Sequence, residues 1–191
     1  MRTFDPWIGS RFKSDGIRGI RLFILGEANY GTGEGERQRT HTADIVRMLG
    51  VQGRFRFYTV TQRLVSGGRG RLSDAERAEF WERVAFYNYI QSFPGPKARW
   101  RPTPEMWAAA RDPFLQTLKE VDPQIVLVLG HELRRNLPHI PAGIEVCAVQ
   151  HPSYPGFRYA QWQPVVEAAL DAIAAKKHRS DVQSDLTLLP L

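Results

Sequence analysis

The sequence is poor in cysteine: Cys147 is the only one among 191 residues. A single thiol can neither close a disulfide nor supply the several thiolates of a metal cluster, so both are excluded within one chain. Cys147 lies in the apolar run 144–149, and we expect it to be a core residue.

Long hydrophobic runs are also missing. No apolar stretch approaches the roughly 20 residues of a membrane-spanning helix, and residues 1–6 lack the apolar segment of a signal peptide. The five histidines are not spaced like metal ligands. We therefore expect a cytoplasmic, soluble monomer that binds neither a membrane nor a metal and needs no cofactor.

Acidic residues are scarcer than basic ones, 20 against 26, which leaves a formal net charge of +6. Much of the excess is arginine interleaved with aromatic residues, at 54–58 and 97–101. This pattern suits a partner with backbone phosphates and stacked bases. A solvated surface or an alternating strand produces the same pattern, so both interpretations stay open.

Four short apolar runs predict buried strands, at 21–25, 84–89, Ile125–Leu129 and 144–149. Helical periodicity and caps predict helices between them. Ser73 forms a capping box with Glu76, and Thr103 followed by Pro104 marks another start. The expected helices are 42–50, 73–82, 103–120, a short one from 130, and 160–175, whereas 54–60 is predicted as a strand or loop.

This alternation of strands and helices predicts an α/β protein, specifically a three-layer α/β/α sandwich around a four-stranded, mainly parallel sheet. The length of 191 residues and the hydrophobic content of 42% suffice for one sizeable core. We therefore expect a single domain over 1–191 that ends in a loosely held tail at 176–191.

Two polar motifs follow two of the predicted strands. Gly26-Glu27-Ala28-Asn29-Tyr30 follows the apolar run 22–25, and His151-Pro152-Ser153 follows 144–149. The carboxyl ends of parallel strands line the ligand crevice of an open α/β sheet. We expect both motifs to meet there with residues 88–91 and 130–131.

These motifs resemble those of the uracil-DNA glycosylase superfamily. The first is similar to the Gly-Glu-Ala-Pro-Gly of its iron-sulfur branch and shares a tyrosine position with the Gly-Gln-Asp-Pro-Tyr-His of its classical branch. His151-Pro152-Ser153 is similar to the second superfamily motif. Between them, Asn88-Tyr89-Ile90-Gln91, Arg101-Pro102-Thr103-Pro104-Glu105 and residues 125–130 follow the order of the iron-sulfur branch, so the resemblance covers roughly 22–153.

The chain departs from that branch at its cluster cysteines. Ser92 and, approximately, Ala110 stand at two of these positions, and no cysteine precedes Gly26. The iron-sulfur cluster is therefore excluded. We expect aromatic packing to take its place, with Trp81, Trp100, Trp107 and Phe114 available.

The resemblance implies roles for three catalytic candidates. His151 would donate a hydrogen bond to the departing base, and Asn88 would recognise the base edge with its donor and acceptor. Glu27 would orient water or stabilise the sugar cation, because Ala28 stands where the classical branch has its water-activating aspartate. The alternatives are a histidine bonded to a backbone carbonyl, an asparagine that completes a turn, and an ordinary salt bridge of Glu27.

The remaining candidates would bind substrate or DNA. Gly26, Ala28 and Asn29 belong to the first motif, and Tyr30 would crowd the 5-position of the base or simply form an aromatic wall. Ser153 would hold a phosphate or cap a turn. The loop with Tyr154, Phe157 and Arg158 lies where the family inserts a side chain into the duplex in place of the flipped base. The alternative is that these surface aromatics only anchor the loop by packing.

These observations lead to the hypothesis of a monofunctional DNA glycosylase, a hydrolase that excises uracil or a related deaminated base from single- or double-stranded DNA. One alternative is a nucleic-acid-binding or base-sensing protein that keeps the crevice without hydrolysis, which Ala28 and Asn29 favour. Another is a hydrolase of small N-glycosides, for which the basic runs would be incidental.

Overall fold

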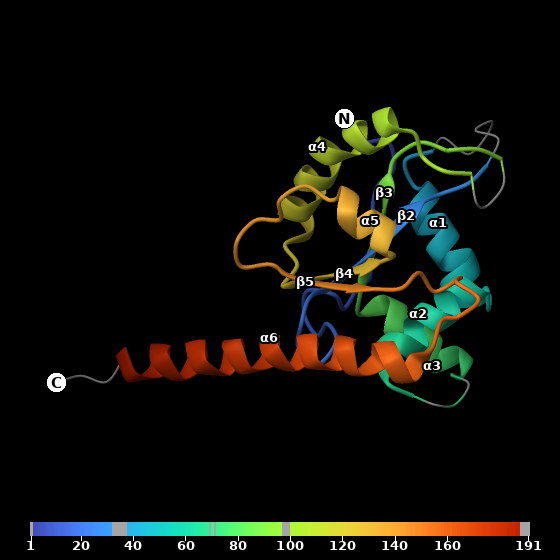
Figure 1. The fold of residues 1–191 in the computed structure, drawn as a ribbon. Coiled ribbons are helices and arrows are strands. Elements are labelled where there is room, and N and C mark those ends of the chain that lie inside the picture. Colours follow the sequence, from blue (N-terminus) through green and yellow to red (C-terminus); the bar gives the residue numbers. More distant parts are fainter. Residues whose placement is uncertain (1, 32–37, 69, 71, 97–99, 188–191) are drawn as a thin grey trace.

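The computed structural model describes residues 2–31, 38–68, 70, 72–96 and 100–187, and it has the predicted α/β class (Figure 1). The strands are β1 (Trp7–Ile8), β2 (Leu22–Ala28), β3 (Ala85–Ile90), β4 (Ile125–Leu129) and β5 (Glu145–Val149). They form one sheet in the order β1-β3-β2-β4-β5. All neighbouring pairs from β3 to β5 are parallel.

The prediction of four strands is wrong by one, because β1 pairs antiparallel with β3 and makes the sheet five-stranded and mixed. Strand β1 has two residues, which is too short for any periodic signal in the sequence. Its position depends on tertiary contacts. Trp7 is buried, and its indole Nε1 donates a hydrogen bond to the carbonyl oxygen of Trp81 at 2.8 Å.

Helices pack on both faces of the sheet, and the alternation of side chains along the strands decides which face each residue serves. In β2, Leu22 and Ile24 join the core cluster shared with α2 (Arg56–Ser66), α3 (Asp74–Glu82) and α6 (Tyr159–Thr187). Phe23 and Leu25 join the cluster shared with α4 (Pro104–Val121) and α5 (His131–Asn136). Both faces of β2 are therefore buried.

The segment at 54–60 is not a strand or loop, because α2 begins at Arg56. The alternation of arginine with phenylalanine suggested a strand, but the apolar positions recur with helical spacing further along. Tyr58, Thr61, Leu64 and Val65 are buried on one face of α2. The predicted helix at 42–50 likewise differs: α1 (His41–Ile45) continues as the π-helix η1 (Val46–Gln52).

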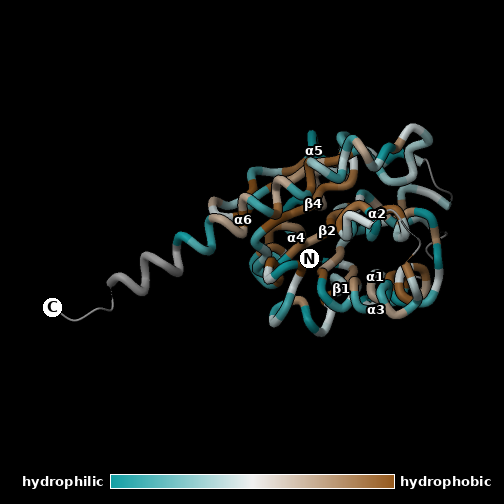
Figure 2. The backbone as a smooth tube through the Cα atoms, turned by 90° about the horizontal axis from the view of Figure 1, so that it is seen from below, coloured by the Kyte–Doolittle hydropathy of each residue, from teal (hydrophilic) through white to brown (hydrophobic). Residues whose placement is uncertain are grey.

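Helix α6 runs to Thr187, well beyond the predicted end at 175, so residues 176–187 continue the helix, and the expectation that they are loosely held stays a prediction. Residues 176–187 contain neither glycine nor proline, and the helix continues without a stop signal. Its C-terminal part extends past the rest of the molecule (Figures 1 and 2). Residues 188–191 lie outside the described residues. No helix in the described ranges is both long and apolar enough to cross a membrane.

The capping box at the start of α3 is confirmed, and it yields a stability prediction. The Ser73 hydroxyl accepts from the Glu76 amide at 3.2 Å, and the Glu76 carboxylate accepts from the Ser73 amide at 2.7 Å. We expect Ser73→Ala to lower the free energy of unfolding by about 1 kcal/mol, measured by urea denaturation. Ser66→Ala, at the exposed end of α2, is the control. Equal effects of both substitutions would contradict the role of the cap.

Candidate functional site

The carboxyl ends of four parallel strands share one edge of the sheet. In the register of the sheet, Gly26 of β2 lies opposite Asn88 of β3, and Leu129 of β4 lies opposite Val149 of β5. The two sequence motifs follow β2 and β5, with β4 between them. The structure therefore places both motifs on the edge where ligands bind in open α/β sheets.

Asn88 lies across the backbone of Gly26. A Cβ atom at Gly26 would be 2.3 Å from Asn88 Oδ1, a separation that no real side chain could tolerate. Gly26 therefore contributes the space that the Asn88 side chain occupies. Asn88 is 5% exposed, and its Nδ2 donates a hydrogen bond of 2.7 Å to Oδ1 of Asn29. Asn88 is thus partnered by a side chain rather than by a turn.

Asn29 is the least expected member of the site. It was predicted to bind substrate or DNA as part of the first motif, and the structure shows it 8% exposed and bonded directly to Asn88. Its Nδ2 is buried without a hydrogen-bond partner among the described residues. An unsatisfied buried donor costs about 1–3 kcal/mol, and Asn29 Nδ2 shares this condition with atoms of the core such as Trp81 Nε1.

His151 is held as a neutral donor. Its Nδ1 accepts a hydrogen bond of 3.1 Å from the backbone amide of Ser153, so the proton of the neutral ring lies on Nε2. Burial lowers the pKa of the imidazole, and the positive charge of Arg101 lowers it further. Because Nδ1 accepts, the alternative of a histidine bonded to a backbone carbonyl would have to use Nε2–H.

Two phenylalanines connect His151 to the Asn88 side of the site. The ring centroid of Phe57, on α2, lies 5.4 Å from that of His151 and 6.1 Å from that of Phe86. Phe86 in turn lies beside Gly26, where its Cζ would be 3.2 Å from an added Cβ. The basic and aromatic run at 54–58 indicated stacking in general, but no local pattern predicted that Phe57 lies beside His151.

Glu27 does not share the face of Asn88. Strand alternation directs Gly26 toward the cluster of α2 and Glu27 toward the side of α4 and α5. The carboxylate is 12% exposed, and its Oε1 is 4.0 Å from Nη1 of Arg101, the limit of an ion pair. Burial raises the pKa of Glu27; Arg101 opposes this effect and Glu132 adds to it.

The other first-motif residues lie at the end of β2. Ala28 is half-buried and packs against the cluster of α4, and Tyr30 is half-buried as well. The amide of Gly31 donates to the carbonyl of Gly95 at 3.1 Å, so the segments after β2 and β3 are joined. The glycine-rich stretch at 32–37 lies outside the described residues.

The loop after β5 turns tightly from His151 into α6. The Tyr154 amide donates to the His151 carbonyl at 2.9 Å, and the Phe157 amide to the Tyr154 carbonyl at 3.1 Å. Ser153, Tyr154 and Arg158 are exposed, whereas Phe157 packs against the core cluster of α2 and α6. Phe157 is thus a packing anchor, whereas Tyr154 is 52% exposed.

The positions of the missing cluster cysteines are structurally unremarkable: Ser92 is exposed and Ala110 is a buried core residue of α4. Of the aromatics expected to compensate, Trp107 and Phe114 pack on Tyr89, with centroids 5.7 and 5.3 Å from it. Trp81 packs on the opposite face, and Trp100 is 55% exposed. Within the described ranges, no group of His, Cys, Asp and Glu side chains is placed to hold a metal ion.

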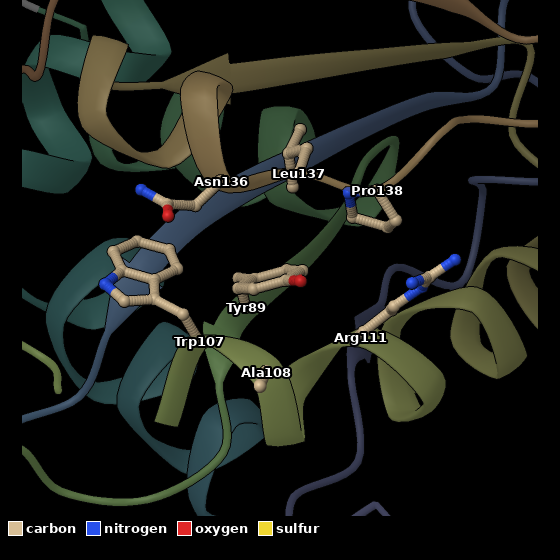
Figure 3. Close-up of a pocket in the computed structure, with 7 residues that line it drawn as sticks. All are labelled: Tyr89, Trp107, Ala108, Arg111, Asn136, Leu137 and Pro138. Carbon is tan, nitrogen blue, oxygen red and sulfur yellow. The ribbon is translucent and has the colours of Figure 1, made fainter. Parts of the chain in front are cut away.

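An open depression of about 320 Å³ lies on the α4 and α5 side of the sheet (Figure 3). Trp107, expected to be core, is half-buried and forms one wall, and Arg111 lies on the opposite side. The lining residues are Tyr89, Trp107, Ala108, Arg111, Asn136, Leu137 and Pro138. None of them was a candidate site residue, and Tyr89 faces away from the Asn88 side of β3.

Comparisons of the sequence with protein-family models and with curated proteins find no match. Functional inference therefore depends on the residues and their geometry.

The close approach of Gly26 and Asn88 makes a substitution there informative. We expect Gly26→Ala to lower the free energy of unfolding by about 1–3 kcal/mol, because the added methyl group displaces Asn88 and breaks its bond to Asn29. Gly68→Ala, where a Cβ meets nothing within 4 Å, is the control. In an Asn88→Ala background the cost should shrink, and an unchanged cost in urea denaturation would refute this contact.

The buried Glu27 carboxylate predicts a pH-dependent effect. Its pKa is higher in the native protein than in the unfolded chain, so its contribution to stability falls as pH rises above about 4.5. We expect Glu27→Gln to melt at a higher temperature than wild type at neutral pH, with the difference vanishing in acid. Glu167→Gln, on the exposed face of α6, should show no such trend. A lower melting temperature at neutral pH would contradict the prediction.

Proposed function

We propose that this protein is a DNA base glycosylase with a fold of the uracil-DNA glycosylase type, which hydrolyses the N-glycosidic bond of uracil or a related deaminated base. The single observation that carries this proposal is the neutral His151, whose Nε2–H is available as a donor because Nδ1 is occupied. Departure of a base develops negative charge on its carbonyl oxygen, and a fixed donor stabilises that charge.

The buried Asn88 amide supports the same function. A base flipped out of the duplex loses its pairing partner, and an enzyme recognises it by hydrogen bonds to its exposed edge. Asn88 offers both a donor and an acceptor from within the edge of the sheet, next to Gly26. The Phe57 ring, between His151 and Phe86, offers an aromatic surface for the base.

Basic side chains near the start of α6 support DNA as the partner. The Arg63 guanidinium lies 4.7 Å from the ring centroid of Tyr159, and the charge of Arg56 also acts on that tyrosine. Arg56 and Arg158 are exposed and form no ion pair with a described residue. Arg158 and the exposed Tyr154 belong to the loop after His151, and Arg56 precedes Phe57 on α2. Such cationic and aromatic side chains suit phosphates and an unpaired base.

A base-binding protein without hydrolysis is the second candidate, and the position of Glu27 favours it. The carboxylate lies on the side of α4 and α5, and Ala28 supplies no replacement on the Asn88 side. In the glycosylase, Glu27 acts from the end of β2, close to Arg101, whose charge also reaches His151. Burial raises the pKa of Glu27 above that of an exposed glutamate, which makes it a better proton donor than an ordinary surface carboxyl group.

One assay distinguishes the two candidates. Labelled single-stranded and duplex oligonucleotides with uracil or hypoxanthine are incubated with the protein and then treated with alkali to cleave abasic sites. We expect base release by wild type and a loss of roughly 100-fold or more in His151→Ala, because the fixed donor is removed. His139→Ala, an exposed histidine, serves as the matched control and should match wild type.

Wild-type protein that binds these oligonucleotides without releasing any base would overturn the glycosylase and establish the base-binding protein. Release from free nucleosides as fast as from DNA would instead identify a hydrolase of small N-glycosides. Affinity for DNA should fall steeply with salt if the arginines contact phosphates.

A further inference from the structure

The carboxamide of Asn88 has a symmetry that matters for base recognition. Turning the amide by 180° exchanges its oxygen and its NH₂ group with almost no change in shape. Uracil presents a ring N–H beside a carbonyl, whereas cytosine presents a ring acceptor beside an amino group. Hypoxanthine and adenine differ in the same way. An asparagine that turns freely therefore accepts both members of each pair.

The structure restrains Asn88 in one orientation. Its Nδ2 donates to Asn29 Oδ1 at 2.7 Å, while its Oδ1 lies against the Cα of Gly26, so close that a Cβ there would be at 2.3 Å. Turning Asn88 alone would bring two amide oxygens together. Turning both amides would place the NH₂ group of Asn88 against the Cα hydrogens of Gly26, which offer no acceptor and favour an oxygen.

We infer that Asn29 is a specificity-determining residue that positions Asn88, so that the site accepts bases with a ring N–H beside a carbonyl and rejects cytosine and adenine. This inference rests on the proposed base recognition by Asn88. The Oδ1 of Asn88 accepts from the ring N–H, and the Nδ2 hydrogen not bonded to Asn29 donates to the neighbouring carbonyl. The buried Nδ2 of Asn29, which has no partner among the described residues, lies in the same cluster and is a further donor for a polar ligand.

The test compares two substitutions of similar size. Asn29→Leu removes the acceptor, whereas Asn29→Asp keeps an oxygen that faces Asn88 and, once ionised, offers no donor. Each protein is assayed for base release from matched oligonucleotides that carry uracil, cytosine, hypoxanthine or adenine. We expect the preference for uracil over cytosine to fall roughly tenfold or more in Asn29→Leu, because the variant loses one oriented amide contact to the base. The preference should persist in Asn29→Asp.

The ratio between bases separates positioning from folding, because a loss of folded protein lowers all four rates together. Melting temperatures of both variants accompany the assay. An unchanged uracil-to-cytosine ratio in Asn29→Leu would overturn the inference, as would a wild-type protein that does not distinguish the two bases.

Failure of the proposed hydrolysis is detected separately. Oligonucleotides with 2′-fluoro-2′-deoxyuridine or 2′-fluoro-2′-deoxycytidine resist cleavage, so their relative affinities report base recognition alone. If wild type releases no base but binds the uridine form more tightly, and Asn29→Leu loses that preference, the glycosylase is refuted and the role of Asn29 stands. Equal affinities of wild type for both forms would refute the role of Asn29.

Discussion

The contact on which the site depends is the passage of the Asn88 side chain across Gly26. The parallel register of β2 and β3 sets these residues opposite each other, and the absence of a Cβ lets an amide oxygen lie on the backbone. The position of Asn88 then brings its Nδ2 to Asn29, and Phe86 extends the same face toward Phe57 and His151. A strand residue thus becomes part of a polar site because its neighbour is glycine.

The sequence predicted the parallel strands well because each is an almost continuous aliphatic or aromatic run, as strands with two buried faces require. It also placed both motifs at the correct edge, since strand ends follow from strand positions. The prediction failed for elements whose position or type depends on tertiary contacts. Strand β1 depends on Trp7, and α2 on apolar positions beyond the window in which 54–60 resembled a strand.

Within the site, residue types were easier to predict than pairings. Asn88 stands out in sequence because it is polar within an apolar run, and His151 because it is polar and follows one. The bond between Asn29 and Asn88 joins residues 59 positions apart, and no local pattern encodes it. The side of Glu27 was hard to predict for another reason. Glu27 belongs to β2 rather than to a loop, and its side chain leaves the strand on the face opposite to that of the neighbouring Gly26.

The charges of the site follow one physical rule, that burial disfavours ionisation. It lowers the pKa of His151 and raises that of Glu27, so both shifts favour the neutral forms. Asn29 and Asn88 carry no charge at all. On the proposed function, the uncharged amides of Asn29 and Asn88 distinguish bases by hydrogen-bond pattern, and the charge that develops on the departing base meets a fixed donor in poorly solvated surroundings, where such an interaction is strongest.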